Sequence, residues 1–233
     1  MERDVYRIAY NQLSDKEQKI YLKTEAAIKR YETLILLEVS PTVMNKIFKA
    51  ILIDCPEIFW FEGKWKKDVL NQYDIAIPIY TMNSYKINNA EGVIDTKIRE
   101  LHFWRKLDEY TKSKNVYMWM IENIKYGMQQ SRGQTIYDAL VNQVAVCKGI
   151  AKAYQIILRE LDVLSTLKEG SIDGSSKHVW NRVNINGQWY NVDVCMGYDR
   201  FSYMFNEREK RNALRGFALS DSYISQNYYM RQY

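Results

Sequence analysis

Apolar residues in the first half of the chain recur at the spacing of helices. Ser14 and Glu17 form a capping box, which predicts the start of a long helix. The expected apolar positions of this helix are Ile20, Tyr21, Ala27, Ile28, Tyr31, Leu34 and Ile35. Ser40 followed by Pro41 predicts a second helix, because Ser suits the cap and Pro suits the first turn. We expect Cys55-Pro56 to end it.

One strand and two further helices are predicted in the remainder of this half. The run from 75 to 80 reads Ile-Ala-Ile-Pro-Ile-Tyr, and its Pro78 indicates an edge strand. Between about Ala90 and Tyr126 we expect a pair of helices, separated near residues 112–115. Residues 1–112 are therefore predicted to form a mainly helical N-terminal region.

The second half combines one strongly amphipathic helix with several strands. The helix is predicted to begin at Cys147, and its apolar stripe consists of Ile150, Ala153, Tyr154, Ile157, Leu158 and Leu161. A strand is expected over 163–169, and a loop rich in Gly and Ser over 170–177. Two more strands, His178–Ile185 and Gln188–Val194, are joined by Asn186-Gly187, the strongest short hairpin signal. Residues 113–233 are thus predicted to be an α+β core, with a helix packed on an antiparallel sheet.

The predicted turn also determines which residues of the hairpin share a face. If Asn186-Gly187 is a two-residue turn, counting back along both strands places Asp193 opposite Trp180. His178 and Asp193 then become diagonal neighbours on one face. The same count places Cys195 opposite His178. The other face carries mostly apolar residues, so we expect it to face the core and the polar face to be distinct from it.

Composition narrows the classes of function. The chain has 233 residues, of which 47% are hydrophobic and 26% charged, in the range of ordinary globular proteins. The net charge of +5 is spread over interleaved Lys, Arg, Asp and Glu residues, so no nucleic-acid partner is expected. The 19 Tyr and 6 Trp could form a stacking surface for carbohydrate, but packing in cores and interfaces is the favoured interpretation.

Cysteine usage and the start of the chain bear on cofactors and location. The three cysteines contain no CxxC pair and no even-numbered framework, so neither a zinc site nor a disulfide scaffold nor any cofactor is expected. This usage favours a reducing compartment. The sequence shows no signal segment and no run of about 18 apolar residues that would span a membrane. We expect a cytoplasmic protein as the sequence stands, or a secreted one if a signal was removed, and the oligomeric state is left open.

Cys147, His178 and Asp193 supply a thiol, an imidazole and a carboxylate, the three groups of a cysteine acyl-transfer site. At a helix start, backbone amides and the helix dipole stabilise a thiolate, which is the reactive form of cysteine. Lys148 adds positive charge, and Gly149 is expected to keep the first turn open to a substrate backbone. The alternatives are a cysteine used for packing and a buried His satisfied by a structural Asp. The three residues together favour the chemical interpretation.

The remaining cysteines and histidine have simpler interpretations. Cys195 is interpreted as a small residue beside the site. Its alternative is a second thiol that forms a regulatory disulfide with Cys147, which requires Cα atoms within about 7 Å. His102 is expected to be a packing or surface residue, and Cys55 to be structural.

Three motifs in this order resemble those of the transglutaminase-like superfamily of bacterial type, which has a papain-like cysteine fold. They are Ala-Val-Cys-Lys-Gly-Ile-Ala-Lys-Ala-Tyr around Cys147, His-Val-Trp-Asn-Arg-Val from His178, and Asn-Gly-Gln-Trp-Tyr-Asn-Val-Asp ending at Asp193. The run Phe-Ala-Leu-Ser-Asp at 217–221 is similar to a segment that follows the core in bacterial members. After Asp193 the chain has Val-Cys-Met where the family often has Thr and Trp, so the wall of the cleft is expected to differ.

The resemblance implies Cys147 as nucleophile, His178 as general base and then acid, and Asp193 as the orienting carboxylate. The family attacks amide carbonyls and passes the thioester to an amine or to water. The implied function is acyl transfer on a peptide or protein substrate, with hydrolysis by a protease or amidase preferred over crosslinking. Gln143 and Tyr126 are candidate side-chain donors to the oxyanion, beside the backbone amide of Cys147.

Two functions of other classes stay open at this stage. One is a catalytically idle module that binds a peptide or glycan, and the other is an assembly protein that uses its N-terminal helices. Replacing Cys147 with Ala should abolish the activity of an enzyme but preserve the ligand affinity of a binding module. Removing the residues before about Ala90 should change the oligomeric state of an assembly protein.

Overall fold

The computed structural model comprises two compact units, residues 1–91 and 92–233, which divide within α3 (Ser84–Arg99). Each unit combines helices with an antiparallel sheet, so the α+β prediction is confirmed. The domain boundary expected at residue 112 stays a prediction. The residues that the structure describes are 5–128, 133–172, 174, 176–198 and 214–230.

The first helix of the N-terminal unit begins where its capping box predicts. α1 (Asp15–Lys29) starts after Ser14, whose backbone amide donates to the Glu17 carboxylate at 2.9 Å. The helix is shorter than predicted, because Tyr31 adopts a left-handed conformation with φ of 61° that ends it. The apolar residues beyond it instead form a short strand, β1 (Ile35–Leu36). The predicted apolar positions Tyr31, Leu34 and Ile35 matched the spacing of a helix by chance, since α1 ends at Lys29.

The second helix agrees with its predicted caps. α2 (Pro41–Asp54) follows Ser40, whose hydroxyl accepts a hydrogen bond from the Val43 amide, and it ends at Cys55. One face of α2 packs on α1, and α2 also contacts strand β2 of the sheet. The 3-10 turn η2 (Tyr10–Gln12) precedes both helices.

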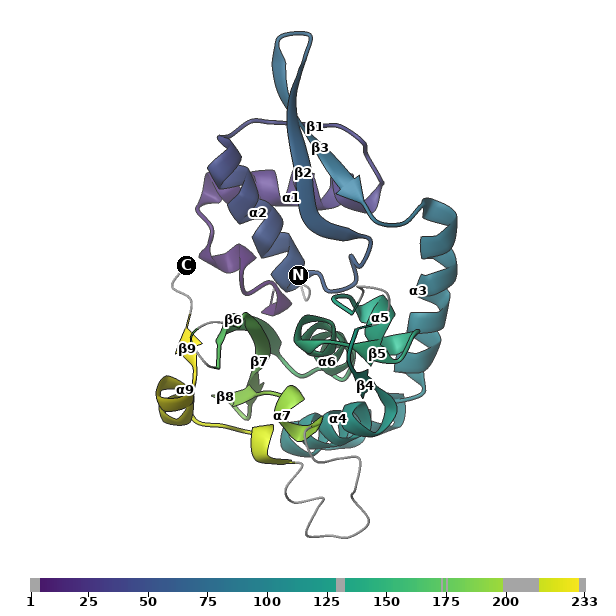
Figure 1. The fold of residues 1–233 in the computed structure, drawn as a ribbon, viewed down its shortest axis with the longest axis vertical. Coiled ribbons are helices and arrows are strands. Elements are labelled where there is room, and N and C mark those ends of the chain that lie inside the picture. Colours follow the sequence, from purple (N-terminus) through teal and green to yellow (C-terminus); the bar gives the residue numbers. More distant parts are fainter. Residues whose placement is uncertain (1–4, 129–132, 173, 175, 199–213, 231–233) are drawn as a thin grey trace. The chain divides into compact units, whose positions relative to one another are not determined.

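The sheet of this unit contains a long hairpin that the sequence analysis missed (Figure 1). β2 (Phe61–Leu70) pairs antiparallel with β3 (Tyr73–Tyr80), and the strand order is β1-β3-β2. The prediction that Pro78 marks an edge strand is therefore wrong, since β3 is central. A central Pro is tolerated because β1 is only two residues long and pairs with Ile75 and Ala76, so no β1 residue faces Pro78.

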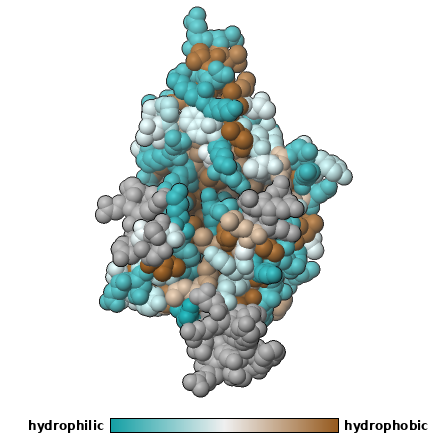
Figure 2. Space-filling model, viewed as in Figure 1, coloured by the Kyte–Doolittle hydropathy of each residue, from teal (hydrophilic) through white to brown (hydrophobic). Residues whose placement is uncertain are grey.

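The tip of the β2–β3 hairpin is exposed. The turn residues Asn71 and Gln72 have φ of 49° and 70°, the left-handed conformation of a tight hairpin turn. Close to the turn, Val69 is 60% exposed and Tyr73 is 64% exposed. Figure 2 shows hydrophobic residues among hydrophilic ones along this hairpin. Because most of β2 is exposed, it lacks the alternation of buried and exposed residues that would have predicted a strand.

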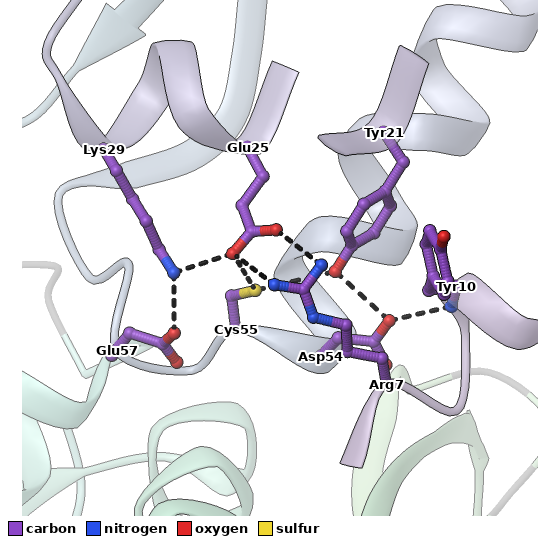
Figure 3. A network of polar contacts seen from close by, with 8 residues as sticks. All are labelled: Arg7, Tyr10, Tyr21, Glu25, Lys29, Asp54, Cys55 and Glu57. Atoms are coloured by element: carbon purple, nitrogen blue, oxygen red, sulfur yellow. Dashed lines mark hydrogen bonds and ion pairs between the residues drawn. The ribbon is translucent and has the colours of Figure 1, made fainter. Parts of the chain in front are cut away.

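A buried polar network holds the start of the chain against α1 and α2 (Figure 3). The Asp54 carboxylate accepts hydrogen bonds from the backbone amides of Ala9 at 2.9 Å and Tyr10 at 2.8 Å. Burial raises the pKa of Asp54 to about 6, although these hydrogen bonds act in the opposite direction. Arg7 forms an ion pair with Glu25 at 3.0 Å in the same network. These contacts fasten residues 7–10 to the helices.

The second unit begins with the second half of α3. The 3-10 segment η3 (His102–Lys106) and the helix α4 (Glu109–Asn123) follow it. The helix break expected near residues 112–115 is wrong, since Lys112 and Ser113 are buried inside α4. The break lies before Asp108, whose carboxylate accepts a hydrogen bond from the Thr111 amide at 2.9 Å and caps α4. Lys and Ser residues alone are weak helix breakers, and the acidic cap was the better signal.

At the centre of the second unit, α6 (Cys147–Glu160) is surrounded by other elements (Figure 1). It contacts α4 and α5 (Ile136–Leu140), and it also contacts the sheet strands β6 and β7. All residues from Gly149 to Leu158 are buried, so the predicted stripe is only part of a helix that packs on every side. Two short parallel strands, β4 (Lys125–Tyr126) and β5 (Val144–Ala145), precede it.

The sheet of the second unit has the strand order β8-β7-β6-β9. The hairpin register is the predicted one, since Ile185 pairs with Gln188 and Asn181 pairs with Val192. Asn186 and Gly187 have φ of 53° and 83°, as the two-residue turn requires. The bounds of these strands are β6 Ser165–Ser171, β7 His178–Ile185, β8 Gln188–Val192 and β9 Tyr229–Met230.

Both faces of this hairpin are buried. One face packs on α6, as predicted, and the Asn181 amide there donates to the carbonyl oxygen of Ala151 at 2.9 Å. The other face, which carries His178 and Trp180, is buried as well. Trp180 is only 1% exposed because the C-terminal segment packs over it, with Ile224 and Tyr228. This segment contains η5 Leu214–Gly216, α9 Asp221–Asn227 and β9, and it follows α7 Cys195–Tyr198.

The structure also bears on membrane association. In the part of the chain that is described, every helix is too short or too polar to cross a bilayer.

Candidate active site

Cys147 is the first residue of α6, as predicted, and is partly exposed. The residue before it, Val146, has no side-chain oxygen and makes no side-chain cap hydrogen bond. The positive end of the helix dipole lies beside the thiol at this first turn. All three cysteines are free thiols.

Gly149 allows close packing of the backbone, whereas we expected it to keep the first turn of the helix open to a substrate. The residue is buried, and an added Cβ would clash with the carbonyl oxygen of Gly133 and lie 3.0 Å from that of Thr135. Gly133 also accepts a hydrogen bond from the Val146 amide at 3.0 Å. The glycine thus lets the 133–135 backbone press against the first turn of α6, which fixes where Cys147 lies.

His178 is the first residue of β7, where it pairs with Gly170 of β6. Its side chain is 10% exposed, and its Nε2 atom lies 2.6 Å from Oδ2 of Asp193. The hairpin register predicted this proximity. The His178 ring also stacks on Trp180, with centroids 6.1 Å apart and planes 18° from parallel. The ring is thus held at one edge by a carboxylate and on one face by an indole.

Asp193 follows the last residue of β8 and is 1% exposed. Its Oδ1 accepts a hydrogen bond from the Cys195 backbone amide at 3.0 Å. Its Oδ2 contacts His178 and also accepts a hydrogen bond from the Tyr228 hydroxyl at 2.8 Å. A buried carboxylate is costly unless it is paired and hydrogen-bonded, and both oxygens of this one are satisfied.

The protonation of His178 follows from these neighbours. Burial lowers its pKa, but hydrogen bonds with Asp193 and Cys147 and the negative charges of both raise the pKa from 6.5 to about 10. Since Asp193 uses Nε2, the ring atom left for Cys147 is Nδ1. At neutral pH the raised pKa therefore favours the protonated imidazolium form of His178. A positively charged imidazole next to a cysteine generally favours the thiolate, which is the nucleophilic form of the thiol.

Cys195 does not lie opposite His178, so that prediction is wrong. The ladder of β8 ends at Val192, and Cys195 begins the short helix α7. Its backbone amide, rather than its thiol, contributes to the site by binding Asp193. The hairpin count failed because it assumed that the strand continued to Val194.

The two residues considered as oxyanion donors are solvent-exposed. Tyr126 is 48% exposed and packs on the ring of Tyr198, with centroids 5.8 Å apart. Gln143 is exposed and adopts a left-handed conformation with φ of 55°. Neither is shown to reach the thiol. His102 lies in η3, and Cys55 is buried in the N-terminal unit, where burial raises the pKa of its thiol.

Sequence reasoning missed Tyr228 and Gly216, which both contact Asp193. The Asp193 backbone amide donates to the Gly216 carbonyl oxygen at 2.7 Å. Tyr228 lies 35 residues after Asp193, and no local pattern connects them. The resemblance of residues 217–221 to a segment of bacterial relatives was the one available signal that the C-terminal segment belongs to the site. Within the described residues, no three His, Cys, Asp or Glu side chains are grouped to hold a metal ion.

Comparison with known families agrees with this geometry. Residues 102–194 match the family model of the Transglutaminase-like superfamily, which includes Cys147, His178 and Asp193. The match lies within the second unit. The resemblance predicted from the three motifs is thereby confirmed. No curated protein matches the chain.

Solved structures similar to the chain include two with transglutaminase or cysteine protease descriptions. One is described as a TGase, with 12% identity, a TM-score of 0.41, and coverage of 69% of this chain and 49% of that one. Another, from Cytophaga hutchinsonii, is described as a "Putative Cysteine Protease", with 12% identity, a TM-score of 0.38, and coverage of 56% and 61%. A third, from Parabacteroides distasonis, is described as a "Putative Protease", with 10% identity, a TM-score of 0.32, and coverage of 55% and 35%.

The chain thus spans less than two thirds of the length of each of these proteins.

Proposed function

We propose that the chain is a cysteine acyl-transfer enzyme that cleaves amide bonds of peptides or proteins through a thioester on Cys147. The observation that carries the proposal is that His178 is hydrogen-bonded both to Asp193, at 2.6 Å, and to Cys147. An activated cysteine nucleophile has these parts: a thiol that contacts an imidazole, and a carboxylate that orients the imidazole. The match to the transglutaminase-like family model supports it.

The first half-reaction forms the thioester. The Cys147 thiolate attacks the amide carbonyl carbon, so that a C–S bond forms and the carbonyl oxygen becomes an oxyanion. In this mechanism the backbone amide of Cys147, at the start of α6, donates a hydrogen bond to that oxyanion. The His178 imidazolium then gives its Nδ1 proton to the leaving amine as the C–N bond breaks. Because His178 is already protonated, its first role in this mechanism is that of an acid.

The second half-reaction releases the acyl group. Neutral His178 now accepts a proton from water, whose oxygen attacks the thioester carbonyl. Collapse of this intermediate breaks the C–S bond, releases a carboxylic acid and restores the thiolate–imidazolium pair. Asp193 stabilises the imidazolium each time it forms and keeps the ring in the orientation that leaves Nδ1 toward Cys147.

Water is the proposed acceptor because it needs no second binding site. A crosslinking reaction requires a bound amine in addition to the acyl donor. A primary alkylamine added to the reaction would distinguish the two outcomes. An amide product that forms faster than the acid would identify the chain as a crosslinking enzyme.

The experiment that tests the proposal uses p-nitrophenyl acetate, which acylates activated thiols without peptide specificity. We expect a burst of about one equivalent of p-nitrophenolate and an acetyl group on the peptide that contains Cys147. Cys147→Ala should lose the burst, whereas Cys195→Ser should keep it as the matched control. An acetyl group on Cys195, or a burst that survives in Cys147→Ala, would contradict the assignment of the nucleophile.

A catalytically idle binding module predicts the opposite result. It would show no burst in the wild-type protein, and peptide affinity would be the same in Cys147→Ala. The complete hydrogen bonding of Asp193 and the partial exposure of Cys147 favour the enzyme.

A further inference from the structure

We infer that Tyr228 is a positioning residue, which holds the Asp193 carboxylate in the orientation that His178 needs. This inference rests on the proposed function and deepens it. It extends the site to the C-terminal segment, residues 214–230, which lies beyond the 102–194 match to the family model.

The contact between Tyr228 and Asp193 is short and buried. The Tyr228 hydroxyl lies 2.8 Å from Oδ2 of Asp193, the same oxygen that lies 2.6 Å from Nε2 of His178. Tyr228 is 5% exposed. Its hydroxyl also lies 2.9 Å from the Met196 sulfur. Because a phenol has one proton to donate and a carboxylate is a far stronger acceptor than a thioether, the proton belongs to Asp193.

The fold fixes Tyr228 through the same strand that fixes His178. Gly170 of β6 pairs with His178 on one side and with Met230 of β9 on the other. Tyr228 lies between the end of α9 and the start of β9, so its backbone has little freedom. Its ring packs on Trp180, with centroids 4.9 Å apart, and lies 6.1 Å from the ring of His178.

Further hydrogen bonds anchor the C-terminal segment to the hairpin. Asn191 exchanges two backbone hydrogen bonds with Leu219, at 2.9 Å and 2.8 Å. The Asp221 carboxylate accepts a hydrogen bond from the side-chain amide of Asn191 at 2.8 Å. It also forms an ion pair with Arg182 at 2.9 Å. The segment is thus attached directly beside the residues that carry His178 and Asp193.

The physical effect of the contact follows from charge. Burial raises the pKa of Tyr228, and the negative charge of Asp193 raises it further, so the phenol stays protonated and acts as a donor. The hydrogen bond restrains Oδ2 and takes up part of its negative charge. Without the hydroxyl, the carboxylate would be less restrained and would interact more strongly with the imidazolium. The pKa of His178 should then rise. Acylation should slow because the less restrained carboxylate no longer holds the imidazole in one orientation toward Cys147.

A packing role alone makes a different prediction. Tyr228→Phe keeps the ring on Trp180 and removes only the hydroxyl. Tyr223 belongs to the same apolar cluster around Trp180, so Tyr223→Phe is the matched control. If Tyr228 acted through packing, both variants would leave the titration of His178 unchanged.

The decisive measurement is the NMR titration of the imidazole nitrogens, in which only His102 and His178 give signals. In Tyr228→Phe, we expect the pKa of His178 to rise by about 0.5–1 unit, and that of His102 to stay the same. The burst rate with p-nitrophenyl acetate should fall about tenfold in the same variant, because the imidazole is held less precisely beside Cys147. Tyr223→Phe should match the wild-type protein in both measurements.

The outcomes separate this inference from the proposed function. A wild-type burst with an unchanged His178 titration and burst rate in Tyr228→Phe would overturn the positioning role and leave the proposed function intact. A wild-type protein without a burst would overturn both, even if the titration still reported the hydrogen bond. A wild-type burst, a raised His178 pKa and a slowed burst in Tyr228→Phe would support the role.

Discussion

The backbone amide of Asp193 donates a hydrogen bond of 2.7 Å to the carbonyl oxygen of Gly216. The two residues are packed so closely that a Cβ at Gly216 would clash with the Asp193 carbonyl and lie 2.9 Å from Cβ of Met196. The Tyr117 hydroxyl hydrogen-bonds to the backbone of the same glycine. The C-terminal segment thus fixes the backbone of Asp193, in addition to its carboxylate.

This close packing predicts the effect of Gly216→Ala. The added methyl group must displace the Asp193 backbone, so we expect a loss of about 1–3 kcal/mol in the free energy of unfolding and a burst rate at least about tenfold lower. Thermal unfolding and the p-nitrophenyl acetate burst measure the two effects. Gly92→Ala is the control, since a Cβ there meets no atom within 4 Å and the residue lies in a helix. Equal behaviour of the two variants would contradict the packing argument.

The pH dependence of stability follows from the raised pKa of His178. Its folded-state pKa of about 10 lies above the ordinary 6.5, so its contribution is fully present below pH 6.5 and is lost as the pH rises through 10. The difference in the free energy of unfolding between the wild-type protein and His178→Ala should therefore shrink between these values. Urea unfolding at a series of pH values measures it. A difference that grows with pH would mean that the ring is neutral in the folded protein.

The same pKa predicts how two reactions at Cys147 should diverge at high pH. Acylation by an amide substrate needs the His178 proton for the leaving amine, so its rate should fall as the pH rises through about 10. Alkylation of Cys147 by iodoacetamide needs only the thiolate and should persist there. Cys55 is an internal control, because burial raises the pKa of its thiol and should keep its alkylation slow.

Asp193→Asn should slow turnover by a factor on the order of 10²–10⁴ while the fold stays intact. The amide keeps an oxygen for the Cys195 amide, but it removes the negative charge that stabilises the imidazolium and places an N–H₂ group near the Tyr228 hydroxyl. Single-turnover acylation measures the effect, with circular dichroism as the check of folding. Full activity of this variant would show that Asp193 does not orient His178.

Asp54→Ala tests the polar network of the N-terminal unit. It leaves the amides of Ala9 and Tyr10 without their acceptor, which costs about 1–3 kcal/mol. The pKa of Asp54 is raised from 3.8 to about 6, so its stabilising contribution is present below pH 3.8 and declines as the pH rises through 6. The variant should thus lose more stability at pH 5 than at pH 8. Hydrogen exchange at Ala9 and Tyr10 reports the local effect, with Asp15→Ala as a surface control.

Local signals predicted the parts of the fold that depend on neighbours in sequence. The capping box at Ser14, the Ser40-Pro41 start and the Asn186-Gly187 turn each determine the backbone within a few residues, and all three are present. The turn then placed His178 beside Asp193, since strand pairing is periodic. This is why two of the site residues could be brought together from sequence alone.

The features that were missed depend on distant contacts. β2 is an exposed edge strand rich in Lys, so it shows no alternation, and its partner β3 became central only because the short strand β1 pairs with it. Tyr228 reaches Asp193 through the pairing of β9 with β6, which has no signature in either segment. Glycine is needed at 149 and 216 because a Cβ at either position would clash with a backbone carbonyl oxygen, and only the folded structure shows these close contacts.

The hairpin turn also limits how the length of this protein can vary. The Asn186 amide is held by the Glu109 carboxylate at 2.6 Å, at the end of the hairpin far from the site. One residue inserted into or deleted from this turn would shift the pairing and rotate Asp193 to the face that packs on α6. Insertions and deletions compatible with an intact site are therefore confined to connections outside the hairpin.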